Sequence, residues 1–407
     1  MSEEKIQVYG YRWIVLLLFM LVNITVQILW ITFAAVTTPA QAYFGGVDEI
    51  NIFLLSAIYM IIYIPDTFLA SWLIDKYDFK IGCGIGAVLT GIFGFLRFFA
   101  GPDYTLMLIF TIGIAIGQPF IMNSITKLSG NWFPETERTT ATGLGTLSMF
   151  VGILLGVLLT PFLIIGNNLS PMLLIYGITS LVIGALFIIF VKSRPLTPPT
   201  SEPINEKVLM SEGLKKLFTN KSFLVLVLLY FLGLGIFNMI TTYIQVIITP
   251  KNPILYDETF AGIVGGIMLL GGIFGAIILS YLSDKFRRKV VLMIISLTIA
   301  AISLYIFAFG KDQVSLLLTA FFFGFGLLGA APVALEYAVD ITKPVPEASS
   351  NGILMMVGQI GGIVFILGLA DLKFPPPSND YLPALLLEAI LITIALIFSF
   401  FLKRVKQ

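Results

Sequence analysis

Apolar stretches of about 20 residues or more follow one another along the whole chain, separated by short polar segments. A helix rises about 1.5 Å per residue, so each stretch can cross a hydrocarbon layer about 30 Å thick. The stretches lack the alternating pattern of β-barrel strands, and backbone groups in lipid must be hydrogen-bonded internally. The pattern therefore predicts an all-α integral membrane protein with twelve transmembrane helices. The predicted spans are 12–39, 51–74, 80–101, 104–128, 139–165, 170–191, 222–249, 259–282, 290–310, 314–340, 348–371 and 381–402.

The distribution of lysine and arginine predicts how these helices are oriented. Of the 24 basic residues, 20 fall on the termini and on the loops that share their side of the membrane. The other loops carry only Lys251, Lys311 and Lys373, and Arg97 lies inside a span. Cytoplasmic loops of membrane proteins carry the excess of Lys and Arg. We therefore expect a multi-pass protein of the cell membrane with both termini in the cytoplasm.

The longest polar segment, 192–221, is rich in proline and separates six spans from six. A D-K-x-x-x-K pattern follows the second span at 75–80 and the eighth span at 284–289, an offset of 209 residues. Its presence in the matching loop of both halves predicts an internal duplication, as found in many transporters. We predict two pseudo-symmetric six-helix bundles, residues 1–191 and 222–407, joined by a cytoplasmic linker.

Composition excludes several classes of protein. Hydrophobic residues make up 58% of the chain and charged residues 12%, with a mean hydropathy of +0.99, whereas soluble domains carry about 25% charged residues. The net charge of +1 provides no basic surplus for binding nucleic acid. There is no histidine and only one cysteine, Cys83, so the usual metal and haem ligands and an internal disulfide are missing. No catalytic dyad is evident either, and we expect a non-enzyme without metal or cofactor.

Polar residues inside the spans are the candidates for a substrate site. Lipid disfavours them, so they should face a bundle interior or a watery cavity. A glutamine in a membrane helix can instead bond to a neighbouring helix, and this alternative is open for Gln118 and Gln359. The candidate substrate-binding residues are Asn23, Gln27 and Trp30, which share one face of the first span, together with Gln118, Asn238, Tyr243 and Gln359.

Ionisable residues supply the candidates for gating or coupling. Without histidine a proton relay would need carboxylates, and Asp66, Glu336 and Glu388 lie inside spans. Asp66 and Glu336 both lie toward the cytoplasmic ends, so a structural or gating role is equally open. The aspartates of the two loop patterns would form ion pairs that hold helix ends together in one state and release them in another. The candidate gating or coupling residues are Asp66, Asp75, Asp284, Arg288 and Glu336.

The duplicated loop resembles the G-x-x-x-D-R/K-x-G-R/K-R/K motif of the major facilitator superfamily. Residues 280–289 are the better copy, while Ser71 and Asp78 stand at the glycine positions of the first copy. The chain is further similar to the feline leukaemia virus subgroup C receptor-related family of that superfamily. Over about residues 12–400, this similarity is carried by Leu29-Trp30-Ile31, Tyr59-Met60, Tyr63-Ile64-Pro65, Trp72-Leu73-Ile74-Asp75, Gly117-Gln118-Pro119-Phe120-Ile121, Trp132-Phe133-Pro134 with Glu137, Leu335-Glu336-Tyr337-Ala338-Val339-Asp340-Ile341-Thr342, Ser349-Ser350-Asn351-Gly352 and Gly358-Gln359-Ile360.

This resemblance implies a central pocket and a class of substrate. Members of the family move choline and ethanolamine, were earlier linked to haem, and have a relative associated with pyridoxine. Their pocket uses a helix-1 tryptophan, glutamines on helices 4 and 11, and a helix-7 tyrosine. Trp30, Gln118 and Gln359 match the first three. Asn238 departs from the pattern, because Phe237-Asn238 stands where the family has Phe-Tyr.

The chemistry of the matched residues favours an amine. A tryptophan face attracts a poorly hydrated ammonium, and two carboxamides can bind a hydroxyl without trapping the cation. Haem fits less well, since no histidine can ligate it. We predict a monomeric alternating-access transporter that carries a small organic solute, such as choline or ethanolamine, between the two bundles. The predicted partners are this small molecule and the lipid bilayer, not nucleic acid. Alternatives are a broad-specificity efflux protein, a transporter of haem, pyridoxine or an organic anion, and a non-transporting receptor.

Overall fold

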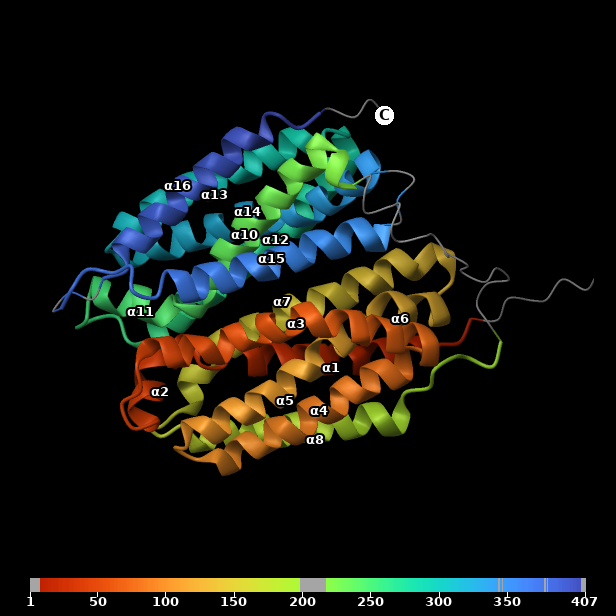
Figure 1. Ribbon diagram of the computed structural model, residues 1–407, viewed down its shortest axis with the longest axis horizontal. Coiled ribbons are helices and arrows are strands. Elements are labelled where there is room, and N and C mark those ends of the chain that lie inside the picture. The colour runs from red at the N-terminus through yellow and green to blue at the C-terminus, as the bar shows by residue number, and fades with distance from the viewer. Residues whose placement is uncertain are drawn as a thin grey trace, which may run out of the picture. The chain divides into compact units, whose positions relative to one another are not determined.

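The computed structural model describes residues 8–197 and 217–403, apart from 343, 344, 346, 377 and 379. Figure 1 shows that the described residues form helices, and none of them belongs to a β-strand. The positions described by their backbone but not by their side chain are 75, 135, 136, 138, 139, 284 and 347–349.

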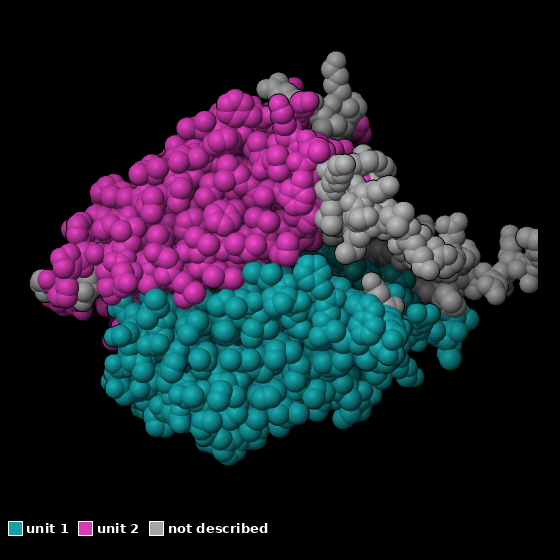
Figure 2. All heavy atoms as spheres, in the orientation of Figure 1, with its two compact units in different colours: residues 1–33, 39–205 teal, residues 34–38, 206–407 magenta. Residues whose placement is uncertain are grey.

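The chain divides into two compact units, coloured separately in Figure 2. Unit 1 comprises residues 1–33 and 39–205, and unit 2 comprises residues 34–38 and 206–407. The short segment 34–38 therefore belongs to the unit that is otherwise built from the second half of the chain. The sequence-based boundaries did not separate this segment.

Unit 1 is a helical bundle in which α4 packs against α3, α5 and α8, and α1 packs against α7 and α8. Its helices are α1 (Arg12–Ile31), α3 (Glu49–Tyr77), α4 (Phe79–Ala100), α5 (Tyr104–Met122), α6 (Ile125–Trp132), α7 (Glu135–Leu163) and α8 (Ser170–Phe190), with the short α2 (Thr37–Tyr43) spanning the boundary between the units.

Unit 2 is a second helical bundle, in which α14 packs against α12 and α13, and α10 packs against α15 and α16. Its elements are the 3-10 turn η1 (Ala34–Val36), α10 (Lys221–Thr242), α11 (Ile244–Ile248), the 3-10 turn η2 (Thr249–Lys251), α12 (Glu258–Phe286), α13 (Lys289–Phe309), α14 (Gln313–Thr342), α15 (Glu347–Gly368) and α16 (Leu382–Ser399).

Twelve helical segments within the described residues are long and apolar enough to cross a membrane, which confirms the predicted number. Several of them end at other residues than the sequence predicted, and two of these differences bear on the site. The first continues through η1 and α2 to Tyr43, whereas the predicted span stopped at residue 39. The seventh ends at Thr242, because the helix is interrupted at Tyr243 before the short α11 begins.

Close backbone contact between helices depends on glycine in both units. In unit 1 a Cβ atom added to Gly86 would lie 2.6 Å from the carbonyl oxygen of Gly117, so α4 and α5 touch backbone to backbone. In unit 2 a Cβ atom on Gly324 would lie 1.8 Å from the carbonyl oxygen of Met268, and one on Gly271 would lie 2.0 Å from that of Phe321. Such contacts are the usual way for helices to associate in lipid, where no hydrophobic effect drives them together.

The offset of 209 residues reappears in the local structure of the two halves. Asp103 caps α5 and Asp312 caps α14, each accepting a hydrogen bond from the backbone N–H three residues later, at 3.0 and 2.8 Å. Asp78 and Arg287 share the same offset, and among the described residues they are the two non-glycine residues with positive φ, +84° and +51°. Both occupy the second glycine position of the loop motif. These matches support the pseudo-symmetry of the two bundles.

Candidate functional site

The polar face of α1 is buried inside unit 1, and two of its three residues are anchored there. The Trp30 indole N–H donates to the carbonyl oxygen of Ser56 on α3 at 3.1 Å. Asn23 donates from Nδ2 to the carbonyl oxygen of Gly145 at 3.1 Å and to Ser148 Oγ at 2.9 Å, which ties α1 to α7. Gln27 is 2% exposed, and its amide nitrogen has no partner among the described residues.

Arg97 fixes the backbone beside Trp30 and was not assigned a role from the sequence. Its guanidinium is buried and forms no ion pair with a carboxylate that the structure describes. It donates to the carbonyl oxygen of Leu29 at 2.8 Å, Tyr59 Oη at 3.1 Å and Thr111 Oγ1 at 2.9 Å. These contacts come from three different helices, α1, α3 and α5. Arg97 therefore joins four helices of unit 1 at the residue that precedes Trp30.

Gln118 lies in α5 directly before Pro119, and its side chain is 7% exposed. It forms no hydrogen bond with any residue that the structure describes. Proline lacks a backbone donor and weakens a helix interior, and α5 ends three residues later at Met122. The interhelical hydrogen bond that competed with a substrate role for Gln118 is thus not found within the described part of the chain.

Two buried or half-buried carboxyls at membrane depth have oxygens without a partner in the described part of the chain. Asp66 lies on α3 directly before Thr67, whose Oγ1 accepts a hydrogen bond from the Asn123 amide at 2.8 Å. Asp66 Oδ2 itself is buried without a hydrogen bond to the described residues. Glu388 on α16 is fully buried in unit 2, and the same holds for both of its carboxyl oxygens.

Unit 2 holds two further carboxamides that, like that of Gln118, have no hydrogen-bond partner among the described residues. Asn238 on α10 is 6% exposed and Gln359 on α15 is partly exposed. Neither takes part in a hydrogen bond with the described residues. α10 and α15 pack closely, since a Cβ atom on Gly361 would lie 2.1 Å from the carbonyl oxygen of Phe231.

Tyr243 is fully buried, and its side chain is occupied by structural contacts. Its hydroxyl donates to the carbonyl oxygen of Ile366, and its ring meets that of Tyr381 edge-on at 5.2 Å. The neighbouring Gln245 accepts hydrogen bonds from Thr38 N at 3.0 Å and Thr38 Oγ1 at 3.1 Å. These bonds hold segment 34–38 in unit 2. The geometry of Tyr243 favours a packing role, and its substrate role stays a prediction.

An ion-pair cluster joins α13 to α14 in unit 2. Lys289 Nζ lies 2.8 Å from Asp340 Oδ2 and 3.4 Å from Glu336 Oε2. Glu336 and Asp340 are four residues apart on one face of α14. Lys289 ends the second loop motif, so the motif contributes a cation to this cluster.

The remaining predicted gating residues are Arg288, Asp75 and Asp284. Arg288 is exposed and pairs with no carboxylate in the described part of the chain. The side chains of Asp75 and Asp284 lie outside the described residues. Their proposed ion pairs stay predictions.

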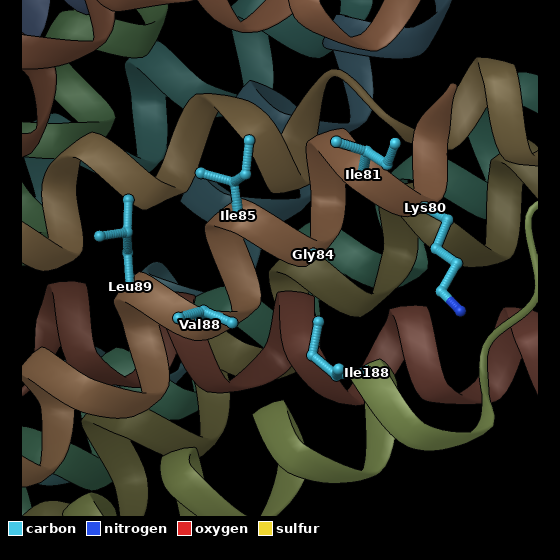
Figure 3. A pocket seen from close by; sticks show the side chains of 7 residues that line it. All are labelled: Lys80, Ile81, Gly84, Ile85, Val88, Leu89 and Ile188. Carbon is cyan, nitrogen blue, oxygen red and sulfur yellow. The ribbon is translucent and has the colours of Figure 1, made fainter. Parts of the chain in front are cut away.

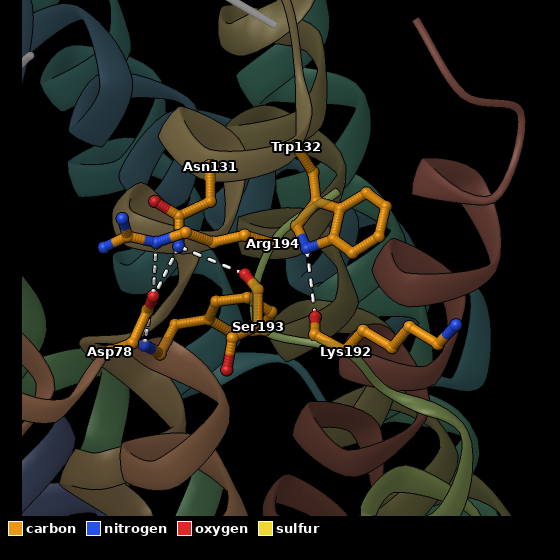
Figure 4. A network of polar contacts seen from close by, with 7 residues as sticks. Asp78, Asn131, Trp132, Lys192, Ser193 and Arg194 are labelled. Carbon is orange, nitrogen blue, oxygen red and sulfur yellow. Dashed lines mark hydrogen bonds and ion pairs between the residues drawn. The ribbon is translucent and has the colours of Figure 1, made fainter. Parts of the chain in front are cut away.

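The loop between α3 and α4 in unit 1 replaces a glycine by Asp78 and uses its carboxylate (Figure 4). Its φ of +84° and ψ of 160° lie in a region that only glycine adopts without strain. Asp78 Oδ1 accepts from Phe79 N at 2.7 Å and Asn131 Nδ2 at 2.6 Å, and Oδ2 pairs with Arg194 Nε at 2.7 Å. These contacts offset the backbone strain.

The same network attaches the first residues of the predicted linker to unit 1. Asn131 Nδ2 also donates to the carbonyl oxygen of Ser193 at 3.2 Å, and Trp132 Nε1 donates to that of Lys192 at 3.1 Å. Figure 4 shows Asn131 and Arg194 at Asp78, with the Trp132–Lys192 hydrogen bond beside them. Asp78 thus connects the duplicated loop, α6 and the segment that follows α8.

Asp78→Gly is expected to loosen this segment without lowering thermal stability by much. The substitution removes strain worth about 1–3 kcal/mol, which offsets the lost polar contacts. Trypsin cleavage after Lys192 in detergent should become several-fold faster. Arg287→Gly is the matched control, because it relieves the equivalent backbone position in unit 2 and leaves Lys192 untouched. Equal cleavage rates in both variants would contradict the assignment.

Lys251 is one of the three cations predicted on the loops opposite the termini, and it caps a helix. Its ammonium donates to the carbonyl oxygens of Phe307 at 3.1 Å and Ala308 at 2.8 Å, at the end of α13. Burial lowers the pKa of Lys251 to about 8, although the nearby Asp380 opposes this shift. Lys251 is therefore not a member of the candidate substrate site.

Sequence reasoning missed the roles of Arg97, Asn131 and Lys289. The partners of Arg97 are helix residues without any shared pattern, so no local signal marks them. For Lys289 a signal existed, since two carboxylates spaced by four residues on the tenth span require a cation nearby.

Comparisons with known proteins agree with the helical architecture. The model of the Major Facilitator Superfamily matches residues 15–366 and 251–406. The chain is 30% identical over 393 residues to solute carrier family 49 member A3 of Xenopus tropicalis, covering 91% of this chain and 80% of that protein. It is 28% identical over 416 residues to the choline/ethanolamine transporter flvcr2b of Danio rerio, covering 96% and 85%.

A solved structure shares the fold. The crystal structure of a bacterial homolog of the human lysosomal transporter Spinster superposes with a TM-score of 0.80 and covers 97% of this chain and 98% of its own. Its sequence identity is 15%, so the similarity concerns the fold alone.

Proposed function

Because this chain is a multi-pass membrane transporter of the Major Facilitator Superfamily, within the feline leukaemia virus subgroup C receptor-related family, we propose that it works by alternating access. The proposed substrate is a small amine or amino alcohol such as choline or ethanolamine. The protein of Danio rerio named above is a choline/ethanolamine transporter, which supports this class of substrate. We further propose that it acts as a monomer in the cell membrane with both termini in the cytoplasm.

One observation carries the proposal. Each unit holds buried or half-buried carboxamides, Gln118 in unit 1 and Gln359 in unit 2, that no described residue satisfies. A polar group left without a partner away from water costs free energy, so such groups persist where a ligand or water binds them. A carboxamide can bond a hydroxyl or carbonyl of a solute. It carries no charge that would retain a cation after transport.

In this proposal the ring face of Trp30 binds the ammonium group of the substrate, while the carboxamides bind its hydroxyl. Its indole N–H bonds to Ser56 in the plane of the ring, which fixes the orientation of the ring and does not use its π face. An ammonium over a tryptophan face gains about 0.5–2 kcal/mol, more when it is desolvated. Arg97 is a positioning residue in this proposal, because it holds the adjacent Leu29 carbonyl.

Asn23, Gln27, Asn238 and Tyr243 complete the proposed substrate set with unequal support. The amide nitrogen of Gln27 is buried without a partner among the described residues. Asn238 is 6% exposed and forms no hydrogen bond with them, which supports a ligand-binding role for both. Asn23 and Tyr243 are engaged in helix packing. Gating is proposed for Asp66, Asp75, Asp284, Arg288 and Glu336, supported at Glu336 by its ion pair with Lys289.

Uptake of labelled choline and ethanolamine into proteoliposomes tests the site. Trp30→Ala, Gln118→Ala and Gln359→Ala are each expected to lower uptake about tenfold, the loss that follows from one missing contact of about 1.4 kcal/mol. Trp72→Ala and Gln313→Ala are the matched controls, because both side chains are exposed. Melting temperatures verify that every variant folds.

The outcomes separate the alternatives. Undiminished uptake by all three site variants would remove the site assignment. Competition by many unrelated dyes would indicate a broad-specificity efflux protein. Binding of choline without flux under any gradient would indicate a receptor.

A further inference from the structure

An open groove with a volume of about 420 Å³ runs along α4 in unit 1, as Figure 3 shows. α4 contributes Ile81, Gly84, Ile85, Val88 and Leu89, and α8 contributes Ile188. The walls are aliphatic. Ile81, Val88 and Ile188 are 47%, 42% and 40% exposed, so no described part of the chain covers the groove.

The length of the groove matches one leaflet of a bilayer. Its lining extends along α4 from Lys80 to Leu89, a rise of about 14 Å at 1.5 Å per residue. The hydrocarbon core of a membrane is about 30 Å thick, so this rise is close to half of it. A single acyl chain from one leaflet would therefore lie along the groove.

Gly84 keeps the groove open. A Cβ atom at this position would lie 3.2 Å from Cδ1 of Ile188, so a larger side chain would fill the space between α4 and α8. This gives the groove a single position at which it can be closed without changing its charge.

Lys80 gives the groove a charged end. Its aliphatic stem lines the groove in Figure 3, and its ammonium forms no hydrogen bond or ion pair with the residues that the structure describes. The neighbouring cations are engaged elsewhere. Arg194 pairs with Asp78, Lys192 lies over the ring of Tyr11, and Lys76 lies over the ring of Trp72.

We propose that this groove binds one anionic phospholipid, with an acyl chain between α4 and α8 and its phosphate group at Lys80. A long lysine at a helix end places its ammonium at the level of lipid headgroups while its stem stays in apolar surroundings. An uncharged or zwitterionic headgroup would leave this ammonium without net compensation. The inference concerns the lipid-facing surface and is independent of the transported solute.

Native mass spectrometry of the full-length protein, with equal amounts of dioleoyl phosphatidylglycerol and dioleoyl phosphatidylcholine, tests the proposal. The wild-type protein is expected to retain phosphatidylglycerol preferentially. Lys80→Gln should reduce that preference about fivefold, the effect of one cation near an anionic surface, and Lys80→Arg should preserve it. Lys76→Gln removes the same charge from the preceding turn and is expected to retain the preference.

A second set of measurements addresses the acyl chain. Gly84→Phe should reduce retention of both lipids alike, because it fills the groove and leaves Lys80 in place. Dihexanoyl phosphatidylglycerol, whose chains are shorter than the groove, should bind the wild-type protein more weakly than the dioleoyl lipid. This comparison holds even if Gly84→Phe does not fold. An unchanged preference in Lys80→Gln, an equal loss in Lys76→Gln, or equal binding of short and long chains would overturn the proposal.

Discussion

Gly324→Leu is expected to prevent unit 2 from reaching its folded state. A Cβ atom at this position would meet the carbonyl oxygen of Met268 at 1.8 Å, its carbonyl carbon at 2.8 Å and the backbone nitrogen of Gly272 at 3.1 Å. All three atoms belong to the backbone of α12, so no side chain can move aside. Overpacking a core costs about 1–3 kcal/mol when side chains yield, and we expect a larger loss here.

The expected result is loss of the monodisperse peak in detergent size-exclusion chromatography. Gly324→Ala should lower the melting temperature by less than Gly324→Leu, because it adds only the first atom. Gly352→Leu is the matched control, since nothing lies within 4 Å of a Cβ atom at that helical position of the same unit. Equal melting of the Gly324 and Gly352 leucine variants would show that α12 and α14 do not touch in this way.

Lys289→Glu is expected to be the most damaging charge change among the described ion pairs. It would place a third carboxylate beside Glu336 and Asp340, where Lys289 and Asp340 are 16% and 19% exposed. Breaking a buried charge pair costs about 3–5 kcal/mol, and partial exposure reduces this to about 2–3 kcal/mol here. The melting temperature in detergent should fall accordingly.

Rescue distinguishes this ion pair from a general effect of charge. The double variant Lys289→Glu with Asp340→Lys restores one opposite-charge pair and should recover more than half of the loss. Lys285→Glu reverses a charge in the same loop at an exposed position and should change stability by less than about 0.5 kcal/mol. An equally large effect of Lys285→Glu, or a failure of the double variant to recover, would contradict the pairing.

The membrane-spanning helices were predictable because their signal is local. The hydropathy of a stretch and its length decide whether it can cross a bilayer, and both can be read without knowing any neighbour. The helix breaks at Tyr243 and near Met122 were harder to predict from the sequence. At Met122 the sequence offers Pro119, which marks a weak point but not where the helix ends.

The candidate site was predictable in its residue types and not in its contacts. Gln118, Asn238 and Gln359 are polar residues in apolar spans, and this contrast alone singles them out. Tyr243 satisfied the same criterion, yet its hydroxyl bonds to Ile366, a backbone acceptor 123 residues away. A local sequence pattern cannot distinguish a polar side chain that is free to bind a ligand from one that is hydrogen-bonded to a carbonyl far along the chain.

For Asp78 the local departure could be seen in the sequence, but the contacts that stabilise it could not. Its place at a glycine position was visible in the sequence as a departure from the motif. The compensation comes from Asn131 and Arg194, 53 and 116 residues further along the chain. A residue that strains the local backbone can therefore be retained when long-range contacts offset the cost in free energy.

The assignment of residues 34–38 to unit 2 limits how this protein can be cut. Ala34, Ala35 and Val36 are at most 2% exposed, and Thr38 provides both hydrogen bonds that Gln245 accepts. A gene fragment beginning at residue 206 would encode a bundle lacking part of its own interior. That fragment, expressed without residues 34–38, should therefore fail to fold, and adding back the first part of the chain should be needed to complete the second bundle.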